Sequence, residues 1–397
     1  MGSSTNFFVL IGAILILSLA TDYIGQKTRL PRVTLLLLFG FLIGPSGLNV
    51  LTDTHQAWFP LATDIALLMI GFVLGSQLSG RNLQKLGRMI FSISLVESSL
   101  TAIIVLLGLL LLGTKPEIAF ILAGIATATA PAATSAVVNE MKARGTFTQT
   151  LLGIVAIDDA WGLIIFSLML IAAGIFAGDT AATPQLLVGA WEIGGAVLVG
   201  VGLGIPAAFL TGRIRSGEPT LVEAIGVVFL CGGISIVLGI SLFLTVMVMG
   251  ATVANLAKHH KRPFHAIEHI EWPFMILFFV LAGASLHLDA LLQIGIVGLA
   301  YIVLRCMGKL SGAWLGAVIS NAPDTIRNWI GLALMPQAGV ALGMALIASQ
   351  RFPESGAFVM SVVISAVVVF ELFGPILTRM ALLRSCEVTN LSQIDEK

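Results

Sequence analysis

Apolar positions along the chain form a succession of long segments that are separated by short polar connections. The segments lie near residues 6–24, 33–48, 59–79, 89–113, 117–138, 148–174, 185–211, 221–237, 240–257, 271–286, 291–319, 327–349 and 356–384. An α-helix crosses a hydrocarbon layer about 30 Å thick with about 20 consecutive apolar residues. The pattern therefore predicts an all-α polytopic membrane protein with thirteen transmembrane helices.

The thirteen segments divide into two groups of six that are joined by one linker helix at residues 185–211. Seven crossings separate the starts of the two groups, so the second group enters the membrane from the opposite face. This is the arrangement of an inverted-topology repeat, which many secondary transporters share. We therefore expect two six-helix inverted repeats.

The fifth segment of each group carries a proline among small residues near its middle. Residues 124–136 read GIATATAPAATSA around Pro131. Residues 335–343 read MPQAGVALG, with Pro336 and Gln337 near the start. Proline removes a backbone hydrogen bond, and lipid cannot satisfy the freed groups, so such breaks are tolerated where they are buried or line a water-filled cavity. We expect two broken helices whose half-helix ends offer their dipoles to ions.

The composition identifies lipid as the solvent for most of the chain, because 57% of the residues are hydrophobic and only 11% are charged. The formal net charge is zero and no long basic stretch occurs, which argues against nucleic acid as a partner. The three cysteines lie far apart, without the close spacings of metal sites. No nucleophile or phosphate-binding motif stands out, so we expect neither an enzyme nor a resident cofactor.

The basic residues sort to one side of the predicted topology. If the N-terminus is outside, the outer loops hold only Lys115 and Arg351. The inner loops and tail then hold Lys27, Arg29, Arg32, Arg81, Lys85, Arg88, Lys142, Arg144, Arg213, Arg215, Lys258, Lys261, Arg262, Arg327, Arg379, Arg384 and Lys397. The positive-inside rule therefore predicts an outside N-terminus and a cytoplasmic C-terminus in the inner (plasma) membrane.

Two adjacent acids, Asp158 and Asp159, lie near the centre of the sixth segment in the run VAIDDAWG. An ionised group at a helix centre costs about 2.5–3.5 kcal/mol on insertion scales, so the doublet needs partners. Neighbouring side chains leave a helix about 100° apart, so the two acids can serve different partners. Intramembrane acids of this kind mark ion pathways, and we expect both to bind cations or protons.

The expected counter-charge is Lys309, which follows Gly308 well inside its own segment. A lysine that is paired with a carboxylate stays charged, and it can release a proton when its partner leaves. Arg305 lies one turn away, and because guanidinium groups hardly ever deprotonate, we expect it to be structural or to snorkel toward the inner side. A buried ion network that only holds helices together is the alternative, but such networks stabilise poorly compared with apolar packing.

Three further polar residues are candidates for the same pathway. Glu97 and Glu371 lie well within apolar runs, but no sequence feature names their partners. Thr129 stands beside the first break and is the expected hydroxyl ligand of the ion, although threonines often bond back to their own helix.

The sequence resembles the monovalent cation:proton antiporter-2 family, and especially its NapA-like sodium/proton antiporters. The resemblance covers essentially the whole chain and rests on the TATAPAAT break, the AIDDAW doublet, the GK pair of the eleventh segment and the second break. It implies that Asp159 binds the transported cation and protons, and that Asp158 pairs with Lys309 in the ion-free state. The transported ion would be Na⁺ at Asp159 and Asp158, with Li⁺ or K⁺ as alternatives, and the aspartate doublet resembles that of electrogenic members.

The resemblance also implies an NhaA/NapA-like antiporter fold, a homodimer and an elevator mechanism. The first three helices of each half would form a dimerisation domain, the last three a mobile core, and the seventh helix a linker. The expected boundaries are 1–86 and 217–288 for dimerisation, 87–178 and 289–386 for the core, 179–216 for the linker and 387–397 for a cytoplasmic tail.

The expected mechanism is competition, in which protons and a monovalent cation share Asp158 and Asp159 and the core moves only when the site is neutralised. The second break, Pro336 to Gly339 with Gln337, carries no charged residue, whereas several relatives have Arg or Glu nearby. Kef-type relatives append a nucleotide-binding domain, which we do not expect in this chain. One alternative is a sodium-coupled organic-solute symporter, which would need an anion-binding residue and room for a larger solute, whereas this midplane is net acidic and lined by small residues. A channel or sensor is the other alternative.

Overall fold

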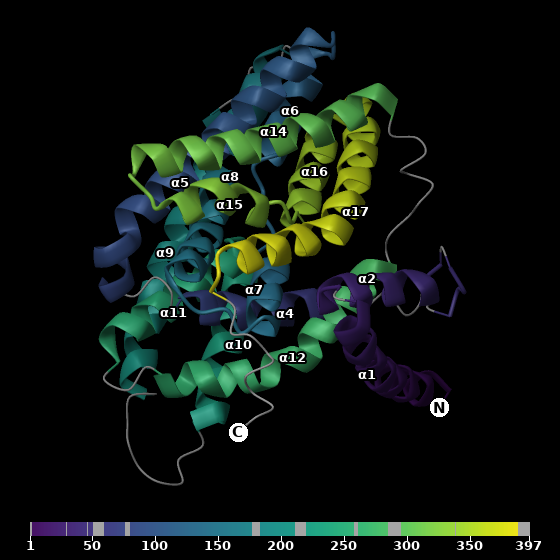
Figure 1. Ribbon diagram of the computed structural model, residues 1–397, viewed down its shortest axis with the longest axis vertical. Helices are drawn as coiled ribbons and strands as arrows, with labels where there is room; N and C mark the ends of the chain where they lie inside the picture. The colour runs from purple at the N-terminus through teal and green to yellow at the C-terminus, as the bar shows by residue number, and fades with distance from the viewer. Residues whose placement is uncertain are drawn as a thin grey trace. The chain divides into compact units, whose positions relative to one another are not determined.

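The regular secondary structure of the described residues is helical. The computed structural model describes residues 2–28, 30–45, 47–50, 59–75, 80–176, 183–210, 220–257, 261–284, 295–337 and 339–387, and the regular elements in these ranges are all helices (Figure 1). The all-α prediction is confirmed.

Most of the predicted apolar segments coincide with single helices. These are α1 (Gly2–Thr28), α2 (Arg32–Ile43), α4 (Phe59–Gly75), α5 (Gly80–Leu111), α8 (Thr146–Phe176), α9 (Thr183–Leu210), α10 (Thr220–Leu238), α11 (Leu242–Leu256), α12 (Lys261–Ala284), α14 (Gly295–Ile319) and α17 (Pro353–Arg384). Each of the other two segments forms a pair of short helices: α6 (Pro116–Ile125) with α7 (Pro131–Glu140), and α15 (Asp324–Ala333) with α16 (Gly339–Arg351). The number of membrane crossings and the repeat architecture stay predictions.

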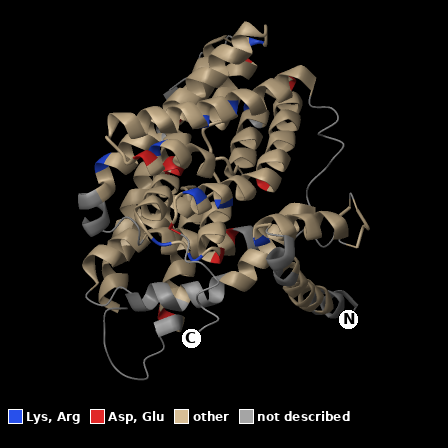
Figure 2. Ribbon diagram, viewed as in Figure 1, with Lys and Arg blue, Asp and Glu red and all other residues tan. Residues whose placement is uncertain are grey.

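The surface of the described helices is suited to lipid. In α5, α8, α9, α14 and α17, long stretches are apolar enough to cross a membrane by length and composition. Large apolar side chains are exposed on such helices, as with Leu111 at 89% and Phe209 at 77% exposure. Charged residues occupy only a small part of the ribbon (Figure 2). An apolar surface of this extent would be a liability in water and is expected in a bilayer.

The chain divides into two compact units. The first unit comprises Met1–Arg81 and Trp191–Leu286, and the second comprises Asn82–Ala190 and His287–Lys397. The predicted roles of these parts, dimerisation for one and ion transport for the other, stay predictions.

Within the first unit, helices pack closely in two pairs. Gly40 of α2 lies against the backbone of Val280 on α12, and Gly283 of α12 lies against Leu37 of α2. The pair α4 and α11 is joined in the same reciprocal way through Gly75 and Gly250. Small residues allow backbones to approach closely where lipid offers no hydrophobic drive for association.

Within the second unit, both proline-containing segments are interrupted. Helix α6 ends at Ile125 and α7 begins at Pro131, the first helical position, where the missing N–H of proline costs no hydrogen bond. Helix α15 ends at Ala333, and α16 begins at Gly339. The two breaks lie against each other, because Gln337 Nε2 donates a hydrogen bond of 3.0 Å to the carbonyl of Ile125.

A stripe of glycines on α14 sets the distance between α14 and α5. A Cβ atom at Gly308, Gly312 or Gly316 would lie 2.6–2.7 Å from a Cα atom of α5. The α5 residues that face these glycines are Thr101, Glu97 and Ile93, respectively. The spacing of four residues places the glycines on one side of α14, and the two backbones are therefore in contact along this stripe.

We predict that Gly312→Ala lowers the stability of the protein. The new methyl group would overlap the backbone of Glu97, and overpacking of this kind costs about 1–3 kcal/mol. The measurement is the melting temperature of the purified protein in detergent. Gly343→Ala on α16 is the matched control, since a Cβ there meets nothing within 4 Å, and it should melt at or above the wild-type temperature. Equal melting temperatures for wild type and Gly312→Ala would contradict the close approach of α5.

Candidate functional site

Lys309 is the centre of a buried polar cluster in the second unit. Its side chain is fully buried, and Nζ lies 2.7 Å from Glu97 Oε1 and 4.0 Å from Asp158 Oδ2. Nζ also donates a hydrogen bond of 2.9 Å to the carbonyl of Thr127, which lies in the break between α6 and α7. Lys309 therefore joins α14 to α5, α8 and the first break.

Glu97 is the closest acidic partner of Lys309, although the sequence analysis predicted it only as a possible pathway acid. Its carboxylate also accepts hydrogen bonds from Thr101 Oγ1 at 3.1 Å and from Ser98 Oγ at 3.3 Å. The glycine stripe brings Glu97 here, because the backbone of Gly312 touches Glu97 one turn beyond Lys309. The GxxxGxxxG spacing from Gly308 is the sequence signal that could have indicated a close neighbour for Lys309.

Asp158 is fully buried on α8 and has a different principal partner from the expected one. Ser94 Oγ donates a hydrogen bond to Asp158 Oδ1. Asp158 Oδ2 makes no hydrogen bond with any described residue, and its distance of 4.0 Å from Lys309 is at the outer limit for an ion pair. A close Asp158–Lys309 pair is thus absent from this conformation, because Glu97 occupies the near position; its existence in an ion-free state stays a prediction.

Asp159 and Thr129 present buried oxygen atoms without protein partners. Asp159 is 4% exposed and Thr129 is 1% exposed. Within the described part of the chain, neither Asp159 Oδ1 nor Thr129 Oγ1 has a hydrogen-bond partner. Buried polar atoms are normally hydrogen-bonded, so unpartnered oxygens of this kind call for a ligand such as a cation, a proton or water.

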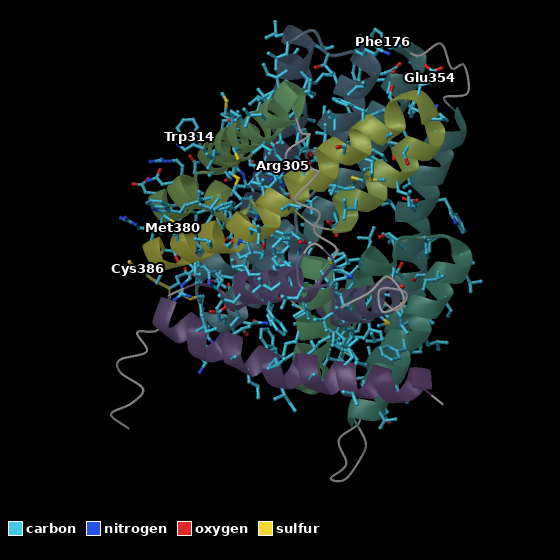
Figure 3. All side chains as sticks on the ribbon, turned by 90° about the vertical axis from the view of Figure 1, so that its right-hand side faces the viewer. Phe176, Arg305, Trp314, Glu354, Met380 and Cys386 are labelled. Carbon is cyan, nitrogen blue, oxygen red and sulfur yellow. The ribbon has the colours of Figure 1, made fainter. Side chains whose placement is uncertain are left out.

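Arg305 occupies the junction between the two breaks, one helical turn from Lys309. Its Nε and Nη2 donate hydrogen bonds of 3.1 and 2.8 Å to the carbonyls of Ala126 and Ala128, and Nη1 donates one of 2.9 Å to the carbonyl of Met335. The guanidinium group also lies 4.2 Å from the ring centroid of Phe370. The side chain is fully buried in the second unit (Figure 3), so the expected structural role fits and the alternative of snorkelling to the surface is wrong.

Gln337 links the second break to the first. Its Nε2 donates to the carbonyl of Ile125 at 3.0 Å and to the hydroxyl of Tyr301 at 3.3 Å. Its Oε1 is buried and has no partner among the described residues. The amide therefore fixes the crossing of the broken helices through one end and offers a free acceptor at the other.

The remaining predicted residues surround the breaks or lie apart from the cluster. Pro131 begins α7, and Pro336 packs against α17, where a Cβ atom on Gly374 would lie 2.7 Å from its Cα. Glu371 is buried on α17, and no described residue contributes an ion pair or a hydrogen bond to it. The structure therefore does not connect Glu371 to the cluster of Lys309.

The charges of the cluster are arranged so that each cation has its own partners. Lys309 is neutralised by Glu97, and Arg305 is held by three carbonyl groups at the ends of α6 and α15. Helix C-terminal ends carry about −0.5 charge each, so two such ends balance one guanidinium group. The carboxylates of Asp158 and Asp159 remain, with oxygen atoms that can exchange protons for a hard cation. No group of three His, Cys, Asp or Glu residues in the described ranges is placed to hold a resident metal ion.

Known relatives of this chain are cation/proton antiporters. Residues 11–383 match the family described as sodium/hydrogen exchanger, transmembrane. The ammonium/H⁺ antiporter subunit AmhT of Alkalihalophilus pseudofirmus is 22% identical, over 92% of this chain and 92% of its own length. The glutathione-regulated potassium-efflux system protein KefC of Escherichia coli is 25% identical over 98% of this chain, which spans 63% of the length of KefC.

Solved structures confirm the fold. The sodium proton antiporter MjNhaP1 from Methanocaldococcus jannaschii matches with a TM-score of 0.75 at 18% sequence identity, over 98% of this chain and 99% of MjNhaP1. A second structure of MjNhaP1, at pH 8, matches with a TM-score of 0.67 over 96% of this chain and 95% of its own. Because the family match spans nearly the whole chain, the protein belongs to the sodium/hydrogen exchanger family of multi-pass membrane antiporters, which exchange cations for protons rather than act as enzymes.

Proposed function

We propose that the protein is a secondary antiporter that exchanges protons for a monovalent cation at Asp158 and Asp159. The observation that carries the proposal is the set of buried, unpartnered oxygens on Asp158, Asp159 and Thr129, beside a lysine that already has its own carboxylate. A cation or protons would complete the coordination of these oxygens. Both ligands compete because each needs the same carboxylates.

The exchange is proposed to be electrogenic. Glu97 balances Lys309, and carbonyl dipoles balance Arg305, so the charge of the site varies only with the two aspartates. Two protons neutralise both aspartates, whereas one monovalent cation neutralises one. A cycle that exchanges two protons for one cation moves one net charge, worth about 2.3 kcal/mol per 100 mV of membrane potential.

Sodium is the proposed cation, with lithium and potassium as alternatives. Carboxylate and hydroxyl oxygens are hard ligands that suit small alkali cations. The relatives are named for ammonium, potassium and sodium transport, so the family as a whole handles several monovalent cations. Ammonium therefore belongs among the cations to be tested.

The proposed cycle is an elevator in a homodimer. The division into two compact units supports it, because the ion-binding residues all belong to the second unit. In this proposal the first unit forms the dimer contact, and the second unit carries the aspartates, loaded with two protons or with one cation, across the plasma membrane. The N-terminus would face outward and the C-terminus the cytoplasm.

The first prediction concerns the exchange itself. In proteoliposomes with an imposed pH gradient, addition of sodium should dissipate the gradient for wild type, and Asp159→Asn should abolish this response because it removes the charge that the cation requires. The measurement is the signal of a pH dye after addition of sodium, lithium, potassium or ammonium. Absence of a response to all four cations with folded protein would rule out the proposal and favour an organic-solute symporter.

The second prediction concerns voltage. A membrane potential, negative inside and clamped with valinomycin, should speed the inward proton flux of wild type. Asp158→Asn leaves one exchanging carboxylate, so any transport that remains should be independent of voltage. Equal voltage dependence of wild type and a transport-active Asp158→Asn would mean that Asp158 does not contribute to the net charge moved in each cycle.

The third prediction separates the pair Glu97 and Lys309 from the exchanging acids. Lys309→Gln leaves Glu97 buried without its counter-charge, and removing one partner of a buried pair costs about 3–5 kcal/mol. The double variant Glu97→Gln with Lys309→Gln removes both charges and should recover most of the melting temperature. If the pair only positions α5 and α14, the double variant also keeps electrogenic exchange. A stable double variant without exchange would instead assign the pair a direct part in transport.

A further inference from the structure

A groove on the second unit lies on the side of α14 opposite to Arg305 and Lys309. It is an open groove with a volume of about 760 Å³. Helix α14 contributes Met307, Leu310, Ser311 and Trp314, and α15 contributes Arg327 and Asn328. The lining is mostly apolar, and Met307, Leu310 and Trp314 are each between 43% and 54% exposed.

Arg327 and Asn328, the charged and amide residues of the groove, lie at one end of it. Ser320 to Pro323 connect α14 to α15, and Trp314, Arg327 and Asn328 lie toward this connection in the sequence of the two helices. Met307, and Ile104 of α5, line the part that is farther from the connection. The groove is therefore apolar along most of its length, with tryptophan, asparagine and arginine at one end. This order of apolar and polar groups matches that of a phospholipid, whose headgroup lies at the membrane interface above its acyl chains.

Arg327 has the charge for an anionic headgroup. Its Nη2 lies 2.6 Å from Asp324 Oδ1, a carboxylate that is 79% exposed, whereas its Nε and Nη1 have no protein partner in the described ranges. Asp324 therefore orients the guanidinium group and weakens its net charge without using its remaining donors. Arginine donors match phosphate oxygens in geometry, and the amide of Asn328, which is exposed, adds further hydrogen-bonding capacity.

We propose that this groove is a binding site for an anionic phospholipid, with its phosphate on Arg327 and Asn328 and an acyl chain along Met307, Leu310 and Ile104. The site is distinct from the ion-binding cluster, so its existence does not depend on the transported cation. The bilayer supplies the ligand at high local concentration. A lipid in the groove would lie against α14, on the side of this helix that faces away from Lys309.

Quenching of Trp314 fluorescence by lipid with brominated acyl chains tests this proposal. Brominated phosphatidylglycerol is present as a few per cent of a phosphatidylcholine bilayer, and the Trp314 signal is the difference between wild type and Trp314→Phe. Quenching should exceed the level set by the mole fraction of brominated lipid. Brominated phosphatidylcholine at the same fraction should give no such excess. Quenching that follows the mole fraction for both lipids would overturn the proposal.

Further variants separate the site from general attraction of anionic lipid to the protein. Arg327→Gln should weaken the preference for phosphatidylglycerol about fivefold, the change that loss of one cation near the bilayer surface brings. Ser311→Phe keeps the charge but obstructs the groove, and it should also reduce the excess quenching. Arg88→Gln removes an exposed arginine near the start of α5, outside the groove, and should leave the preference unchanged. An equal loss of the phosphatidylglycerol preference in Arg327→Gln and Arg88→Gln would overturn the proposal. Disulfide-linked dimers of Ser311→Cys would also overturn it, because they would identify a second copy of the chain as the occupant.

Discussion

The backbone carbonyl groups that two broken helices leave unpaired are the constraint on which the second unit depends. In a membrane, such groups have no water to bond, and each must find a partner within the protein. Arg305 supplies three donors at once, to Ala126, Ala128 and Met335. A single side chain therefore fixes the crossing of both breaks, and the helix that carries it cannot move independently of them.

The position of Lys309 follows from that of Arg305. The two residues are four apart on α14 and so share one side of the helix. Arg305 holds this side against the breaks, which brings Lys309 to the carbonyl of Thr127. The glycine stripe beside them admits α5 at backbone contact, and α5 delivers Glu97. The result is a site in which Lys309 and Arg305 both have protein partners, while Asp158 Oδ2 and Asp159 Oδ1 have no hydrogen-bond partner among the described residues.

The sequence was sufficient for the elements and for most members of the site, but not for their pairing. Apolar length, mid-segment prolines and buried charges predicted the helices, both breaks and the cluster of Asp158 and Lys309. The sequence pointed to Asp158 as the partner of Lys309, whereas Glu97 lies closer in the structure. Both are acids within apolar runs, and only the packing of α5 on α14 brings Glu97 nearer. The carbonyl partners of Arg305 could not be predicted either, because every residue has a backbone carbonyl and the sequence does not indicate which of them accept hydrogen bonds from Arg305.

Helix α14 has one rigid side and one compliant side. Toward α5, a methyl group at any position of the glycine stripe would overlap backbone, so this side cannot yield. Toward the groove, Met307 and Leu310 are flexible and partly exposed, and they can adjust to what lies against them. Any displacement of α14 must therefore be taken up on the groove side. A ligand in the groove would therefore lie against the side of α14 where the packing can adjust, and not against the side that holds Lys309 beside Glu97.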